Sequence, residues 1–84
     1  MIKQDQIQPQ HQEMLTEIGR QLKAYRKEKK QGYIDAAKGV GVSKNTLYRM
    51  EEGEINFQFT TLLQVLDYYG VSVYDFFQIL IKES

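Results

Sequence analysis

Several residue types are scarce or missing in this 84-residue chain, and each shortage excludes a class of protein. The chain has no cysteine, which excludes disulfides and thiolate metal sites. His11 is the single histidine, and no glycine-rich phosphate loop or group of metal-ligating residues accompanies it. No apolar run approaches the ~20 residues of a membrane span, and the polar beginning is not that of a signal peptide. We therefore expect a cytoplasmic protein with no catalytic residues, no metal, no cofactor and no membrane partner.

The charge is unevenly distributed, although 11 basic and 11 acidic residues give a net charge of zero. Residues 20–49 carry nine Lys or Arg and two acids, whereas residues 50–84 carry one Lys and six acids. Residues 1–19 carry one Lys and three acids. This asymmetry favours a basic face for a polyanion, with the acidic end turned away. The alternative is that the basic residues only form a solvated helix face.

Residues 33–53 predict two short helices joined by a tight glycine turn. Gly41 can adopt the left-handed backbone that ends the first helix, and the small Ala37 allows the second helix to cross closely. Ser43 can cap the second helix through its hydroxyl. The residues that anchor this helix on the core are Leu47 and Met50. Those left facing outward are Lys44, Asn45, Thr46, Tyr48 and Arg49. This layout is typical of a helix-turn-helix whose second helix enters the DNA major groove.

The rest of the pattern predicts an all-α, compact five-helix domain. Helices are expected over residues 13–28, 33–40, 44–52, 61–69 and 73–81. Residues 1–12 are rich in glutamine and are expected to form a flexible N-terminal arm, which leaves 13–84 as the helix-turn-helix DNA-binding domain. The aromatic residues expected in the core are Tyr25, Tyr69, Phe76 and Phe77.

Two stretches then carry a family resemblance over about residues 14–80. One runs from Ala37 through Gly41-Val42-Ser43 to Leu47, Glu51 and Gly53. The other runs from Leu62-Leu63 through Tyr69-Gly70-Val71-Ser72 to Phe76-Phe77. On these residues the chain resembles the phage-repressor/Cro-like family of helix-turn-helix DNA-binding regulators. The resemblance implies a lambda-repressor-like fold. Two positions depart from the family: Tyr33 stands where a phosphate-clamping Gln is usual, and Phe57 where a Pro often follows.

The resemblance implies roles for the outward-facing side chains. Lys44, Asn45 and Arg49 match positions that touch base edges, and Thr46 matches one that touches a phosphate or a thymine methyl. The guanidinium of Arg49 suits guanine, the amide of Asn45 suits adenine, and Lys44 can reach guanine acceptors. Tyr48 points outward, and we expect it either to lie against a sugar or a thymine methyl or to pack on its helix neighbours. The resemblance also implies a buried structural ion pair between Arg26 and Glu51, which would lock the recognition helix in place.

Phosphate contacts would set the position of the protein on DNA and supply salt-dependent affinity. The candidates are Lys23, Lys27, Lys30, Tyr33, Lys38, Ser43 and Asn56. A tyrosine hydroxyl can still reach a phosphate at position 33.

The last predicted helix carries apolar residues that its core-facing stripe does not use. Tyr74, Ile79 and Ile81 could form a self-complementary dimer patch, or the patch could serve another protein. The leading hypothesis is a sequence-specific transcriptional regulator, a repressor that binds a short palindromic operator in double-stranded DNA as a homodimer. The alternative is an antitoxin-type interaction module that binds a small protein partner as well as DNA.

Overall fold

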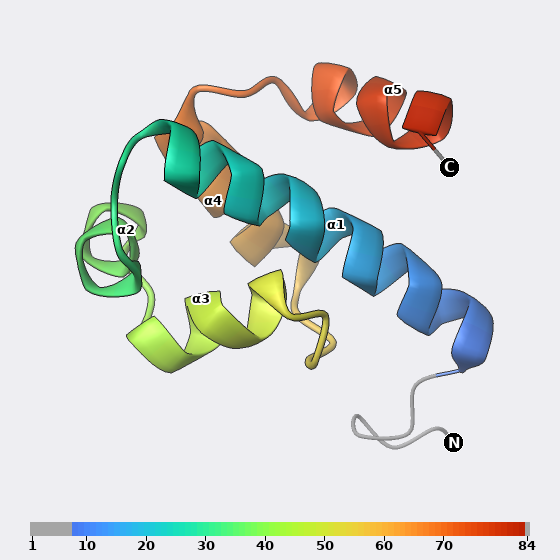
Figure 1. Ribbon diagram of the computed structural model, residues 1–84, viewed down its shortest axis with the longest axis horizontal. Helices are drawn as coiled ribbons and strands as arrows, with labels where there is room; N and C mark the ends of the chain where they lie inside the picture. The colour runs from blue at the N-terminus through green and yellow to red at the C-terminus, as the bar shows by residue number, and fades with distance from the viewer. Residues whose placement is uncertain (1–7, 84) are drawn as a thin grey trace.

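Residues 8–83, which the structure describes, fold into five α-helices and contain no β-strand. In this computed structural model the helices are α1 (Pro9–Glu28), α2 (Tyr33–Val40), α3 (Lys44–Glu51), α4 (Phe59–Tyr69) and α5 (Val73–Glu83). Figure 1 shows α1 crossing the middle of the molecule, with α3 on one side of it and α5 on the other. The all-α, five-helix architecture predicted from the sequence is confirmed. Helix α1 therefore separates α3, the second helix of the helix-turn-helix, from the C-terminal helix α5.

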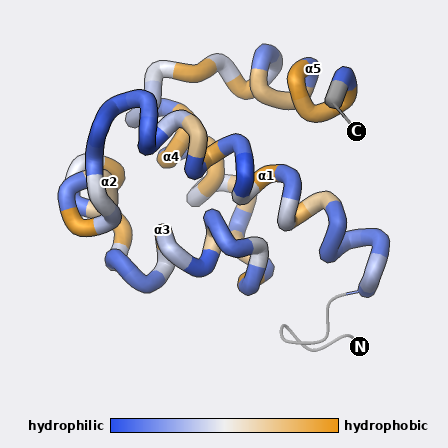
Figure 2. Tube along the Cα trace, viewed as in Figure 1, coloured by the Kyte–Doolittle hydropathy of each residue, from blue (hydrophilic) through white to orange (hydrophobic). Residues whose placement is uncertain are grey.

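The core forms where the apolar faces of the five helices meet. Phe76 of α5 is fully buried, and Tyr25, Tyr69 and Phe77 pack against this core while remaining partly exposed. Hydrophobic residues are concentrated in α4 and α5, and hydrophilic residues cover much of α1 and α3 (Figure 2). The buried apolar residues are Ile18, Leu22, Ala36, Ala37, Val40, Leu47, Met50, Leu62, Val65, Leu66, Phe76 and Leu80. Burying one such large side chain is worth about 1.5–3 kcal/mol, so this set supplies the main driving force for folding.

The first helix begins earlier than predicted, at Pro9, so residues 9–12 belong to α1 and not to an arm. Proline is favoured at the first helical position, because its φ angle suits the helix and its missing N–H has no partner to lose there. The side-chain amide of Gln12 donates to the backbone oxygen of Gly53 at 2.8 Å, which ties this turn to the segment after α3. His11 is exposed on the same turn. Residues 1–7 of the predicted arm lie outside the described residues.

Other helix ends differ by one or two residues. The end of α3 is Glu51 and not Glu52, and α5 continues to Glu83. The start of α4 is Phe59, whose ring stacks on that of Phe77 with centroids 6.3 Å apart. Tertiary contacts of this kind leave no local signal at a helix end.

The turn between α2 and α3 has the predicted chemistry. Gly41 adopts a φ of +94°, and its N–H donates to the carbonyl of Ala37 at 2.8 Å. The hydroxyl of Ser43 accepts a hydrogen bond from the backbone N–H of Thr46 at 3.0 Å, so Ser43 caps α3. Ala37 is buried where the two helices approach each other. The turn therefore fixes the direction in which α3 leaves α2.

A close helix crossing places α3 against α1, and the sequence analysis did not identify it. A Cβ atom at Gly19 would lie 2.3 Å from the backbone oxygen of Glu51. Only a hydrogen atom fits there, so any larger residue would push α3 away from α1. Gly19 therefore allows the backbone of α3 to lie directly on α1.

Candidate nucleic-acid interface

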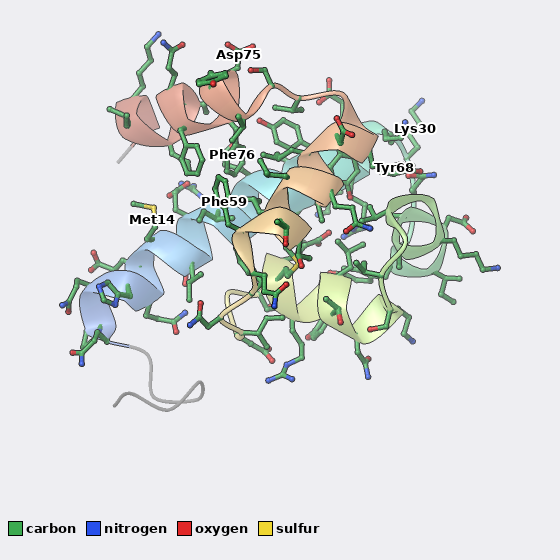
Figure 3. The ribbon with its side chains drawn as sticks, turned by 180° about the vertical axis from the view of Figure 1, so that it is seen from behind. Met14, Lys30, Phe59, Tyr68, Asp75 and Phe76 are labelled. Carbon is green, nitrogen blue, oxygen red and sulfur yellow. The ribbon has the colours of Figure 1, made fainter. Side chains whose placement is uncertain are left out.

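One face of α3 is open to solvent, and the opposite face is fully buried. Leu47 and Met50 have no exposed surface. On the open face Lys44, Asn45 and Arg49 are exposed. The back view in Figure 3 shows α3 along the lower edge and α5 at the opposite edge of the molecule. The three side chains expected to reach bases therefore stand on the same free edge, away from the acidic C-terminal helix.

Thr46 is partly exposed and belongs to the cap of α3. The hydroxyl of Ser43 donates to the Thr46 hydroxyl at 2.8 Å and also accepts from the Thr46 backbone N–H. The Thr46 hydroxyl can still donate outward, since it acts as the acceptor in this pair. The hydroxyl proton of Ser43, a candidate phosphate ligand, is therefore hydrogen-bonded within the turn.

The ion pair between Arg26 and Glu51 holds α3 from below. Arg26 Nε donates to Glu51 Oε2 at 2.8 Å and Nη2 donates to Oε1 at 3.2 Å, and both residues are buried. Nη1 donates to the backbone oxygen of Gln31 at 2.7 Å, which adds the turn between α1 and α2 to the network. Hydrogen bonding to Glu51 raises the pKa of Arg26 and outweighs the opposing effect of burial. The pair that the family resemblance implies is therefore present and connects three segments.

Tyr33 joins this network with its ring. The guanidinium carbon of Arg26 lies 4.0 Å from the ring centroid of Tyr33, a cation–π distance. On its other side Tyr33 meets Tyr48 edge to face, with centroids 5.3 Å apart. Burial, followed by the charge of Glu51, raises the pKa of Tyr33. The structure thus makes Tyr33 a packing partner of the ion pair, unlike the phosphate-clamping glutamine that it replaces. It also gives Tyr48, 42% exposed, a packed neighbour.

The basic residues expected to meet phosphates do not all lie near α3. Lys23 Nζ lies 3.8 Å from a carboxylate oxygen of Glu52, so Lys23 stands beside the C-terminal end of α3. Lys27, Lys38 and Asn56 are exposed. Lys30 has a left-handed backbone, with φ +58°, and lies on the side of α2 away from α3 (Figure 3). The structure therefore does not bring Lys30 to the edge formed by α3.

One charged residue beside this edge was missed. The carboxylate oxygen Oε1 of Glu54 lies 3.8 Å from Nε of Arg49, and both side chains are about half exposed. Glu54 comes directly after Gly53, whose φ of +70° belongs to the turn that ends the helix. The position of Glu54 in the helix-ending turn was the signal that could have revealed this contact, because that turn folds the chain back toward position 49.

The outer face of α5 carries exposed apolar side chains. Tyr74 is 81% exposed and Ile81 is 74% exposed, and a spacing of seven places both on one face of the helix. Ile79 lies two positions from Ile81, which puts it on the opposite flank, where it is half-buried. Next to the face of Tyr74 and Ile81, the stacked pair Phe59 and Phe77 continues the apolar surface onto α4. The predicted patch of three residues is therefore split, and its larger part extends toward α4.

Within residues 8–83, no group of three or more histidine, cysteine, aspartate or glutamate residues could hold a metal ion. None of the helices described is long and apolar enough to cross a membrane.

Comparisons with known proteins agree with this geometry. The sequence model of a family described as a helix-turn-helix domain matches residues 17–75. The crystal structure of the wild-type restriction-modification controller protein C.Esp1396I is similar, with a TM-score of 0.75 and 26% identity over 83% of this chain and 91% of that one. An HTH_3 family transcriptional regulator from Vibrio cholerae is also similar, with a TM-score of 0.70 and 31% identity. The match covers 80% of this chain and 38% of that regulator. No curated protein matches the chain.

Proposed function

The chain belongs to the helix-turn-helix family of DNA-binding transcriptional regulators, and we propose that it is a sequence-specific repressor that binds a short palindromic operator as a dimer. The phage-repressor/Cro-like membership predicted from the sequence is confirmed, and proteins of this kind are regulators and not enzymes. The observation that carries the proposal is the open face of α3, where Lys44, Asn45 and Arg49 stand exposed above a fully buried anchor. The likeness to a restriction-modification controller protein supports a regulatory role.

In this proposal α3 lies in the major groove and three side chains read base edges. Arg49 donates through its fork to O6 and N7 of a guanine, and Asn45 pairs with N6 and N7 of an adenine. Lys44, in the first turn of α3, donates to guanine acceptors. Thr46 and Tyr48 contact a thymine methyl or the sugar-phosphate backbone beside these bases.

Phosphate contacts come from residues that flank α3. We assign this role to Lys23, Lys27, Lys38 and Asn56, and to Ser43 through its backbone N–H, because its hydroxyl proton is bonded to Thr46. Two earlier candidates are left out: Lys30, because it lies away from the α3 edge, and Tyr33, because its ring is committed to Arg26 and Tyr48. Each phosphate neutralised by a lysine releases counterions, so affinity falls steeply with salt.

Dimerisation is assigned to the apolar face formed by Tyr74 and Ile81 of α5 with the adjoining Phe59–Phe77 pair. A two-fold axis through this face leaves α3 of each subunit free, because α5 and α3 lie on opposite sides of α1 (Figure 1). Both recognition helices can meet half-sites about one DNA turn, ~34 Å, apart only if the axis brings the two α3 helices to the same side of the dimer. The protein would act in the cytoplasm, where its DNA is accessible.

Selection of bound fragments from random duplex DNA, followed by sequencing, tests this function. We expect the wild type to enrich one imperfect palindrome. Arg49→Ala should flatten the preference at one base pair of each half-site, where a bidentate contact discriminates by about 1–3 kcal/mol. Lys30→Asn removes the same charge away from α3 and should leave the base profile unchanged. If the wild type binds the selected site and scrambled DNA equally, base readout is refuted.

The same exposed apolar face would suit the alternative, a small protein partner. Sedimentation equilibrium separates the two possibilities, since a homodimer forms from the purified chain alone. Tyr74→Arg should shift the wild-type dimer toward monomer and lower operator affinity, while helix content stays the same. A wild type that remains monomeric at tens of micromolar would remove the dimer from the proposal and favour the interaction module.

A further inference from the structure

The turn that ends α3 fixes the position of Glu54. Gly53 has a φ of +70°, its N–H donates to the carbonyl of Met50 at 3.2 Å, and the N–H of Glu54 donates to the carbonyl of Arg49 at 2.9 Å. These two bonds form a Schellman motif, in which the residue after the glycine folds back over the last helical turn. Backbone geometry therefore places Glu54 beside Arg49 independently of any side-chain attraction.

The acidic residues at this end of α3 have different tasks. Glu51 is buried and bonded to Arg26, and Glu52 lies 3.8 Å from Lys23. Glu54 is the acid that contacts Arg49, the residue proposed to read guanine, with 3.8 Å between Oε1 and Nε. Both of these side chains are half exposed, so their pair contributes little to stability. A carboxylate here also faces the approaching DNA phosphates, which it repels, so it weakens general affinity for DNA.

We propose that Glu54 is a positioning residue for base recognition, which holds the guanidinium of Arg49 at Nε and leaves both terminal nitrogens for O6 and N7 of a guanine. Holding the fork in advance reduces the side-chain freedom that is lost on binding. The negative charge of Glu54 also weakens the ion pair that Arg49 could form with a phosphate at non-operator sites. Glu54 thereby raises the ratio of specific to non-specific binding. This inference rests on the proposed function.

The test repeats the random-duplex selection with Glu54→Gln, Glu54→Asp and the double variant Arg49→Ala/Glu54→Gln. The matched control is Asp75→Asn, which removes the same charge from the first turn of α5, at the edge of the molecule opposite α3 (Figure 3). Circular dichroism confirms that each variant is folded. Binding to the enriched site and to a scrambled duplex is then measured between about 50 and 200 mM salt.

For Glu54→Gln we expect the preference at the base pair read by Arg49 to fall about fivefold or more. Affinity for the scrambled duplex should rise. The slope of log affinity against log salt concentration should become steeper, by the release of up to about one more counterion. Glu54→Asp keeps the charge but shortens the reach, so it should lose preference at the same base pair without a rise in non-specific affinity. In the Arg49→Ala background, Glu54→Gln should cause no further loss of preference.

A Glu54→Gln profile that matches those of the wild type and Asp75→Asn would overturn the positioning role. A loss of preference that persists in the Arg49→Ala background would also overturn it, because Glu54 would then read a base itself. A wild type that enriches no sequence refutes the proposed function instead, and the role of Glu54 falls with it.

Discussion

The ion pair between Arg26 and Glu51 makes a quantitative prediction about stability. The Glu51 side chain has no exposed surface and that of Arg26 is 8% exposed, so a substitution that removes one partner leaves the other charge buried. Such a loss costs about 3–5 kcal/mol. A domain of this size has a total stability of about 4–13 kcal/mol, so either Arg26→Met or Glu51→Leu should remove a large share of it. The melting temperature should fall by roughly 12 °C or more.

Replacing both partners separates the ion pair from simple packing. Arg26→Met/Glu51→Leu leaves no buried charge, and we expect it to be more stable than either single variant. It should remain about 1 kcal/mol below the wild type, because Gln31 loses a hydrogen bond to its carbonyl and Tyr33 loses its cation–π contact. Urea unfolding followed by circular dichroism at 222 nm measures all four proteins. Losses that simply add in the double variant would refute this account of the pair.

Two further predictions concern the same scaffold. Gly19→Ala should destabilise the protein by about 1–3 kcal/mol or more and weaken DNA binding, because its Cβ would lie 2.3 Å from the Glu51 backbone oxygen. The control Gly32→Ala, with nothing within 4 Å of its Cβ, should be close to neutral in the same urea unfolding, and equal effects would contradict the close crossing. Burial, with the charge of Glu51 adding, raises the pKa of Tyr69 to about 12, so the folded state keeps this proton to a higher pH than the unfolded state. Stability present below pH ~10 should therefore decline toward pH ~12. Tyr69→Phe should lessen that decline and be as stable as the wild type at pH 7, since the Tyr69 hydroxyl is buried without a hydrogen-bond partner among the described residues.

The helix-turn-helix could be predicted because its signals are local. Gly41 and Ser43 determine the turn through their own backbone and hydroxyl chemistry, and Leu47 and Met50 mark the buried face by spacing alone. The same spacing left the candidate base-reading residues on the open face. Each of these signals acts within a few residues, so it predicts the local structure without knowledge of the tertiary contacts.

What the sequence did not reveal depends on contacts between distant residues. Gly19 has no special φ angle, and its importance comes from the α3 backbone that rests on it. The start of α1 at Pro9 goes with a bond from Gln12 to Gly53, which are 41 positions apart. Tyr33 was a phosphate candidate by analogy with a glutamine, and that analogy could not reveal the packing of its ring against Arg26. Spacing along the chain contains none of these distances.

The division of α3 into a buried face and an open face has a consequence for how the protein can diverge. Lys44, Asn45 and Arg49 can change without disturbing the interior, so under the proposed function new operator preferences can arise while the scaffold is conserved. Tyr48 is the exception, because its contact with Tyr33 links it to the Arg26 guanidinium. Among related sequences, substitutions at position 48 should therefore be accompanied by substitutions at position 33.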